Sequence, residues 1–93
     1  MRIIGYIEHP VLKITVFKMN NKISVKLESG LYEQTYKFRE SNHLKNIQDV
    51  QRLIDEEFVQ AVANDFNNMH QRKMRVMDRF LPQTEEDEFD TLI

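Results

Sequence analysis

Residues 12–39, LKITVFKMNNKISVKLESGLYEQTYKFR, decide the fold of this chain. Apolar and polar side chains alternate along this stretch with the period of two that is typical of half-buried strands. Asn20-Asn21 interrupts the alternation, and asparagine tolerates the positive φ of a tight hairpin turn. The pattern predicts two antiparallel strands that share one apolar face. This face would carry Leu12, Ile14, Val16, Ile23, Val25 and Leu27.

The two turn positions predict the strand register. A two-residue turn at Asn20-Asn21 pairs Val16 with Val25. A second turn at Ser29-Gly30 pairs Lys26 with Glu33 on one face and Val25 with Gln34 on the other. The result is a three-stranded antiparallel meander. Residues 2–8 are expected to add a fourth strand, followed by a bend at His9-Pro10.

Residues 47–81 have a helical period, with apolar side chains every three or four positions apart from one gap that only Lys73 bridges. Asn46 is expected to cap the start, and Pro82 follows the end. A continuous helix of this length measures about 52 Å, twice the length of the strands. We therefore expect one long or broken helix on one sheet face. It breaks at Asp55, or less readily at Asn64 or Asn67-Asn68, or its second half projects toward another chain.

Length and composition predict one small α+β domain over residues 1–82, with the meander in 1–40 and the helical region in 46–81. The chain has 93 residues, 41% of them hydrophobic and 30% charged, and a net charge of −2. No apolar run is long enough to cross a membrane, so no membrane contact is predicted. The N-terminal residues lack a signal-peptide core, and the expected location is cytoplasmic.

Charge is unevenly distributed along the chain. Residues 1–40 carry a net charge of +3, residues 41–82 are neutral, and residues 83–93 carry −5. This acidic C-terminal tail also contains Phe89, Leu92 and Ile93. Two interpretations remain open: a disordered acidic tail, or a segment that docks on the basic sheet face with Phe89 near Phe17.

The sequence contains no recognisable catalytic or metal-binding motif. It has no cysteine, which excludes disulfides, cysteine-ligated zinc and a thiol nucleophile. His9, His43 and His70 lack the spacing of metal ligands, and two glycines cannot form a glycine-rich phosphate loop. We predict no catalytic residue, no metal and no cofactor. A small enzyme without a linear motif remains an alternative.

The solvent face of the predicted sheet is basic. Its key residues are Lys13, Phe17, Lys22, Lys26 and Lys37. Basic and aromatic groups on an open sheet resemble, in chemistry only, the platforms that stack single-stranded bases. Glu28 and Glu33 are interleaved with these lysines and favour cross-strand salt bridges instead. Weak single-stranded nucleic-acid binding is therefore the alternative function and not the main one.

The helical region supplies the preferred hypothesis, self-association. Residues 47–65 carry a net charge of −4 and residues 66–81 carry +3, so two antiparallel helices would match acidic to basic halves. The predicted interaction residues are Phe66, Met69, Met74, Met77, Phe80 and, in the tail, Phe89. The sequence predicts a non-enzymatic interaction or assembly module that forms a homodimer or binds another protein. A helical hairpin within one chain is the competing explanation of the extra length.

Overall fold

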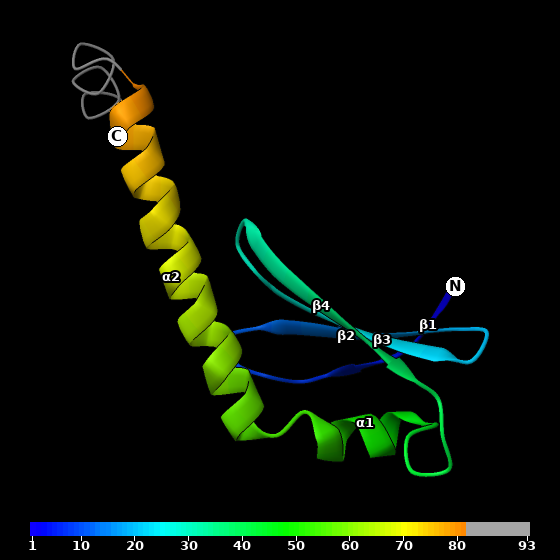
Figure 1. Ribbon diagram of the computed structural model, residues 1–93. Helices are drawn as coiled ribbons and strands as arrows, with labels where there is room; N and C mark the ends of the chain where they lie inside the picture. The colour runs from blue at the N-terminus through cyan, green and yellow to red at the C-terminus, as the bar shows by residue number, and fades with distance from the viewer. Residues whose placement is uncertain (82–93) are drawn as a thin grey trace.

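The computed structural model describes residues 1–81, which form a four-stranded antiparallel sheet followed by two helices (Figure 1). The α+β fold predicted from the sequence is confirmed. The strands are neighbours in chain order, as in a meander. Their bounds are β1 Arg2–Ile7, β2 Lys13–Met19, β3 Lys22–Ser29 and β4 Tyr32–Arg39; the helices are α1 Ile47–Leu53 and α2 Glu56–Phe80.

The first hairpin has the predicted register, and the second differs from it. Val16 pairs with Val25, as expected from a turn at Asn20-Asn21. In the second hairpin Val25 pairs with Tyr36, not with Gln34, so the register predicted from Ser29-Gly30 is wrong by two residues. The central residues of the turn are Gly30 and Leu31. Gly30 takes the first central position with a φ of +59°. Hairpin turns that have a positive φ only at this position favour glycine there. Because the error is even, the side chains of β4 keep their predicted faces.

The fourth strand is confirmed, with an irregularity at its centre. The register of β1 against β2 shifts between Ile3 and Gly5, as in a β-bulge. An ideal Cβ on Gly5 would lie 3.0 Å from Ile47 Cδ1 and 3.1 Å from its Cγ1. Glycine at this point therefore allows α1 to approach β1 closely.

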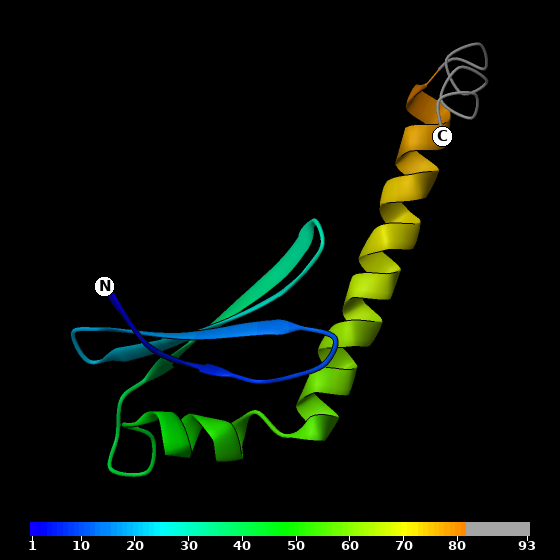
Figure 2. The same ribbon diagram turned by 180° about the vertical axis from the view of Figure 1, so that it is seen from behind.

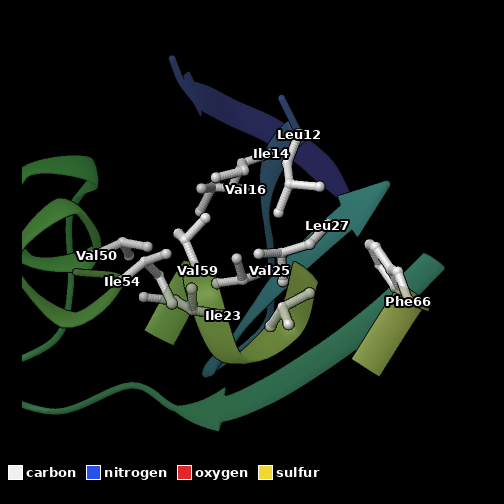
Figure 3. Close-up of a cluster of buried hydrophobic side chains, with 11 residues drawn as sticks. Leu12, Ile14, Val16, Ile23, Val25, Leu27, Val50, Ile54, Val59 and Phe66 are labelled. Carbon is white, nitrogen blue, oxygen red and sulfur yellow. The ribbon is translucent and has the colours of Figure 1, made fainter. Parts of the chain in front are cut away.

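The core lies between the inner face of the sheet and the two helices (Figure 3). The six side chains predicted for the apolar face are all buried, and four of them are fully inaccessible: Val16, Ile23, Val25 and Leu27. Complete burial of a side chain of this size contributes roughly 1.5–3 kcal/mol. The helices complete the core with Val50, Ile54, Val59, Val62 and Phe66.

The helical region breaks at the predicted point. Asn46 caps α1 by accepting a hydrogen bond from Asp49 N at 2.9 Å, and Asp55 caps α2 by accepting one from Phe58 N at 2.9 Å. From there α2 continues for 25 residues without interruption at Asn64 or Asn67-Asn68. A continuous α2 excludes a hairpin between its two halves.

The second half of α2 extends beyond the sheet (Figures 1 and 2). The molecule measures 57 × 25 × 20 Å with a radius of gyration of 17.7 Å, whereas a compact chain of this length has one of about 12 Å. Neither described helix has an apolar stretch sufficient to cross a bilayer. The predicted acidic tail, residues 83–93, lies outside the described residues.

Candidate interaction surfaces

The apolar stripe of α2 divides into a covered and an uncovered part. Phe66, predicted as an interaction residue, is only 6% exposed and belongs to the core, so it lies in the covered part of the stripe. The sheet covers a longer part of α2 than the sequence indicated. The ring of Phe66 stacks on that of Tyr32 in β4, with ring centroids 6.4 Å apart. Met69 is half-buried at the edge of the core. The uncovered part of the stripe therefore begins near Met69.

Exposed apolar side chains continue to the end of α2. Phe80 is 77% exposed and Met74 is 41% exposed, while Met77 is half-buried. Val76, which was not among the predicted residues, is 47% exposed and lies between the Met69 and Phe80 positions on the same helical face. A helical wheel would have found it, because it lies seven residues from Met69. Met74 lies on the flank of this stripe, and Phe89 lies outside the described residues.

A hollow of about 610 Å³ marks the place where α2 leaves the sheet. Tyr32 lines this hollow: its hydroxyl lies 2.8 Å from His70 Nδ1, and Lys73 Nζ lies 5.5 Å from the centre of its ring. Val11 and Leu31 contribute apolar side chains to the lining, and they are 65% and 84% exposed. The hollow thus joins exposed apolar loop residues to the beginning of the uncovered stripe.

Gln34, a polar residue on the apolar face, has defined partners. Its Nε2 donates to Asp65 Oδ2 of α2 at 3.1 Å, and its Oε1 accepts from the Tyr36 hydroxyl at 2.8 Å. The amide is therefore satisfied by the helix and by a neighbour on its own strand. It ties β4 to the middle of α2.

The outer face of the sheet holds the predicted basic residues and more apolar ones than expected. Strand pairing places Ile3, Phe17, Ser24 and Lys37 in one row across the sheet. The next row contains Tyr6, Thr15, Lys26 and Thr35, and a third contains Met19, Lys22 and Arg39. Aromatic and apolar groups thus lie on β1 and β2, and basic groups on β3 and β4. Gly5 and the bulge interrupt the alternation of side chains in β1, so the sequence did not show that Ile3 and Tyr6 share this face.

Acidic groups on this face are confined to one end. Lys26 Nζ lies 3.8 Å from Glu28 Oε2 and 3.9 Å from Glu33 Oε2, so the two carboxylates share one ammonium group. Lys13 pairs with Glu28 at the same end of the sheet. At the other end, Lys22 and Lys37 have no carboxylate within 4 Å among residues 1–81.

A hollow of about 290 Å³ lies over this face, and Glu33 is the acidic residue in its lining. Phe17, Lys22, Lys26 and Lys37 all line it, so the structure brings together four of the five predicted residues. The fifth, Lys13, lies outside it. Ser24 and Thr35 add hydroxyl groups to the lining, and Met1, Met19 and Glu33 complete it.

The three histidines lie apart. Within residues 1–81 no group of three acidic, histidine or cysteine side chains could hold a metal ion. His9 Nδ1 accepts from Val11 N at 3.1 Å and Leu12 N at 3.3 Å, which orders the loop between β1 and β2. Its Nε2 points toward Glu56 Oε2 at 3.6 Å.

Asp49 is a carboxyl group whose pKa lies below its ordinary value. The hydrogen bond that its Oδ2 accepts from Lys45 N, at 3.0 Å, lowers the pKa of this carboxyl, and Arg52 lowers it further. Its position at the start of α1 indicates a structural, helix-capping role.

Comparison with known proteins gives no relative: no family description, no curated protein and no solved structure matches this chain. The surfaces of the molecule therefore provide the basis for a functional proposal.

Proposed function

We propose that this protein is a non-enzymatic assembly module that self-associates through residues 69–80 of α2. The main supporting observation is the length of α2 relative to the sheet, which leaves an apolar stripe that no other part of residues 1–81 covers. Exposed apolar patches rimmed by polar groups are typical of protein interaction sites. The stripe comprises Met69, Val76, Met77 and Phe80.

A second copy of the chain is the proposed occupant. Full overlap of two antiparallel helices is not available, because the sheet covers the apolar face of the acidic half. A shorter overlap, with its twofold axis near Arg72 and Lys73, would place Phe80 of one copy over the Phe66 end of the other. The hollow beside Tyr32 would then receive the apolar end of the partner helix.

This overlap also retains charge complementarity. Arg79 of one copy would lie near the Asp65 position of the other, on the same flank of the stripe. Lys73 lies close to the axis, but its ammonium group is held over the Tyr32 ring. Its aliphatic stem therefore presents apolar surface to the partner, as lysine side chains do at the edges of apolar contacts.

Replacement of Val76 by glutamate tests the proposal. Val76→Glu places an unpaired carboxylate in the contact and should shift the full chain from dimer to monomer in sedimentation velocity. Gln71→Glu is the matched control, because it adds the same charge on the opposite face of α2 and should leave the dimer intact.

A circular dichroism melt of both variants separates loss of association from loss of folding. Val76 is exposed in the single chain, so a monomeric but folded Val76→Glu protein is the expected result. A wild-type chain that is monomeric at all concentrations would reject self-association and favour a different protein as the partner of the stripe.

A further inference from the structure

We propose that the outer face of the sheet binds single-stranded nucleic acid, with bases stacked on Phe17 and Tyr6 and phosphates bound by Lys22 and Lys37. This inference is independent of the helix-mediated association, because both helices pack on the inner face (Figure 3). It rests on how the sheet distributes aromatic, hydroxyl and basic groups.

The aromatic half of the face offers two stacking positions. Tyr6 is 56% exposed, and Phe17 is half-buried and lines the hollow. Tyr6 pairs directly with Thr15, which makes it the diagonal neighbour of Phe17 across adjacent strands. Diagonal neighbours lie about 7–8 Å apart, within reach of two consecutive bases of an extended strand. Thr15, directly across from Tyr6 and two residues before Phe17, is buried, at 4% exposure.

The basic side chains of β3 and β4 lie where the phosphate backbone of a strand stacked on these rings would run. Lys37 occupies the same cross-strand row as Phe17, two strands away, or about 10 Å. Ser24 lies between them in that row and presents a hydroxyl where the sugar of a nucleotide would pass. One nucleotide can therefore contact the ring with its base and an ammonium group with its phosphate.

Of the two carboxylates on this face, only Glu33 lines the hollow, and Lys26 lies 3.9 Å from it. Glu28 and Glu33 lie at the Lys13 end of the face and share Lys26. Neither Lys22 nor Lys37 lies within 4 Å of a carboxylate among residues 1–81. Arg39 lies beside Lys22 in the same cross-strand row. The attraction for phosphate is thus concentrated near Phe17, where stacking is available.

Fluorescence anisotropy of the full chain with a labelled oligouridylate of about twelve nucleotides tests the site. Binding is expected at low salt, and it should weaken as salt rises. Phe17→Leu retains an apolar side chain but removes the ring, and should weaken binding about fivefold or more with an unchanged salt slope. Lys22→Gln/Lys37→Gln should reduce that slope by about 1.4, because each phosphate that a lysine neutralises contributes about 0.7.

Lys45→Gln/Arg75→Gln is the matched control. It removes the same charge from exposed positions outside the face and should leave affinity and slope nearly unchanged. Equal weakening by both double substitutions, or equal binding of a duplex, would reduce the interaction to nonspecific charge attraction and overturn the proposal. Absence of binding at low salt would also overturn it, and binding of a peptide with the sequence of residues 83–93 in its place would assign the face to the acidic tail.

Discussion

Gly5 of β1 lies against the side chain of Ile47 in α1. The sequence revealed Gly5 only as a weak point in a strand, because nothing in a linear pattern shows which side chain lies above a glycine. The structure explains it by close packing, since an added Cβ would meet two carbons of Ile47. The same limit applies to Phe66, whose burial depends on how far the sheet reaches along the helix.

Gly5→Ala is expected to lower the free energy of unfolding by about 1–2 kcal/mol through overpacking against Ile47. Urea denaturation measures this change, and Ile47→Val in the same chain should recover part of it. Gly30→Ala is the control. It has open space around its Cβ and loses stability, about 1 kcal/mol, through its positive φ. Additive effects of Gly5→Ala and Ile47→Val would contradict the packing explanation.

Among the elements, the strands were the most predictable and the second turn the least. Period-two alternation determined the face of every residue in β2, β3 and β4. The choice between two adjacent turn positions depended on whether Gly30 takes the first or the second central position, which alternation does not determine. The helix break was predictable because Asp55 is a strong N-cap followed by acidic residues, both of which stabilise a new helix start.

α1 provides a prediction about pH at the element scale. Seven residues are too few for a stable isolated helix, so its cap and its buried contacts must hold it. The pKa of Asp49 is lowered in the folded chain, so its contribution to stability is present above the unfolded value near 3.8 and is lost as pH falls through the folded pKa. Asp49→Asn should therefore be less stable than wild type at pH 7, and the difference should shrink in acid. Urea denaturation at neutral and acidic pH measures it; a constant difference would contradict the capping role.

At the scale of the whole molecule, the apolar stripe of α2 was easier to predict from the sequence than the outer face of the sheet. The excess length of the helical region over the sheet was predictable from residue counts alone, and it identified the uncovered segment before its burial was known. The composition of the outer face was less predictable, because Ile3 and Tyr6 join Phe17 only through a strand whose alternation is interrupted. Self-association would bring two such sheet faces into one particle, joined by their helices.

The mass of the full chain in solution, measured by light scattering on a sizing column at low and high salt, tests self-association most directly. We expect a particle of twice the 11.2 kDa chain mass that persists at high salt, because the proposed contact is mainly apolar. The same dimer is expected for a chain that ends at residue 82. A particle of 11.2 kDa under all of these conditions would contradict self-association through α2.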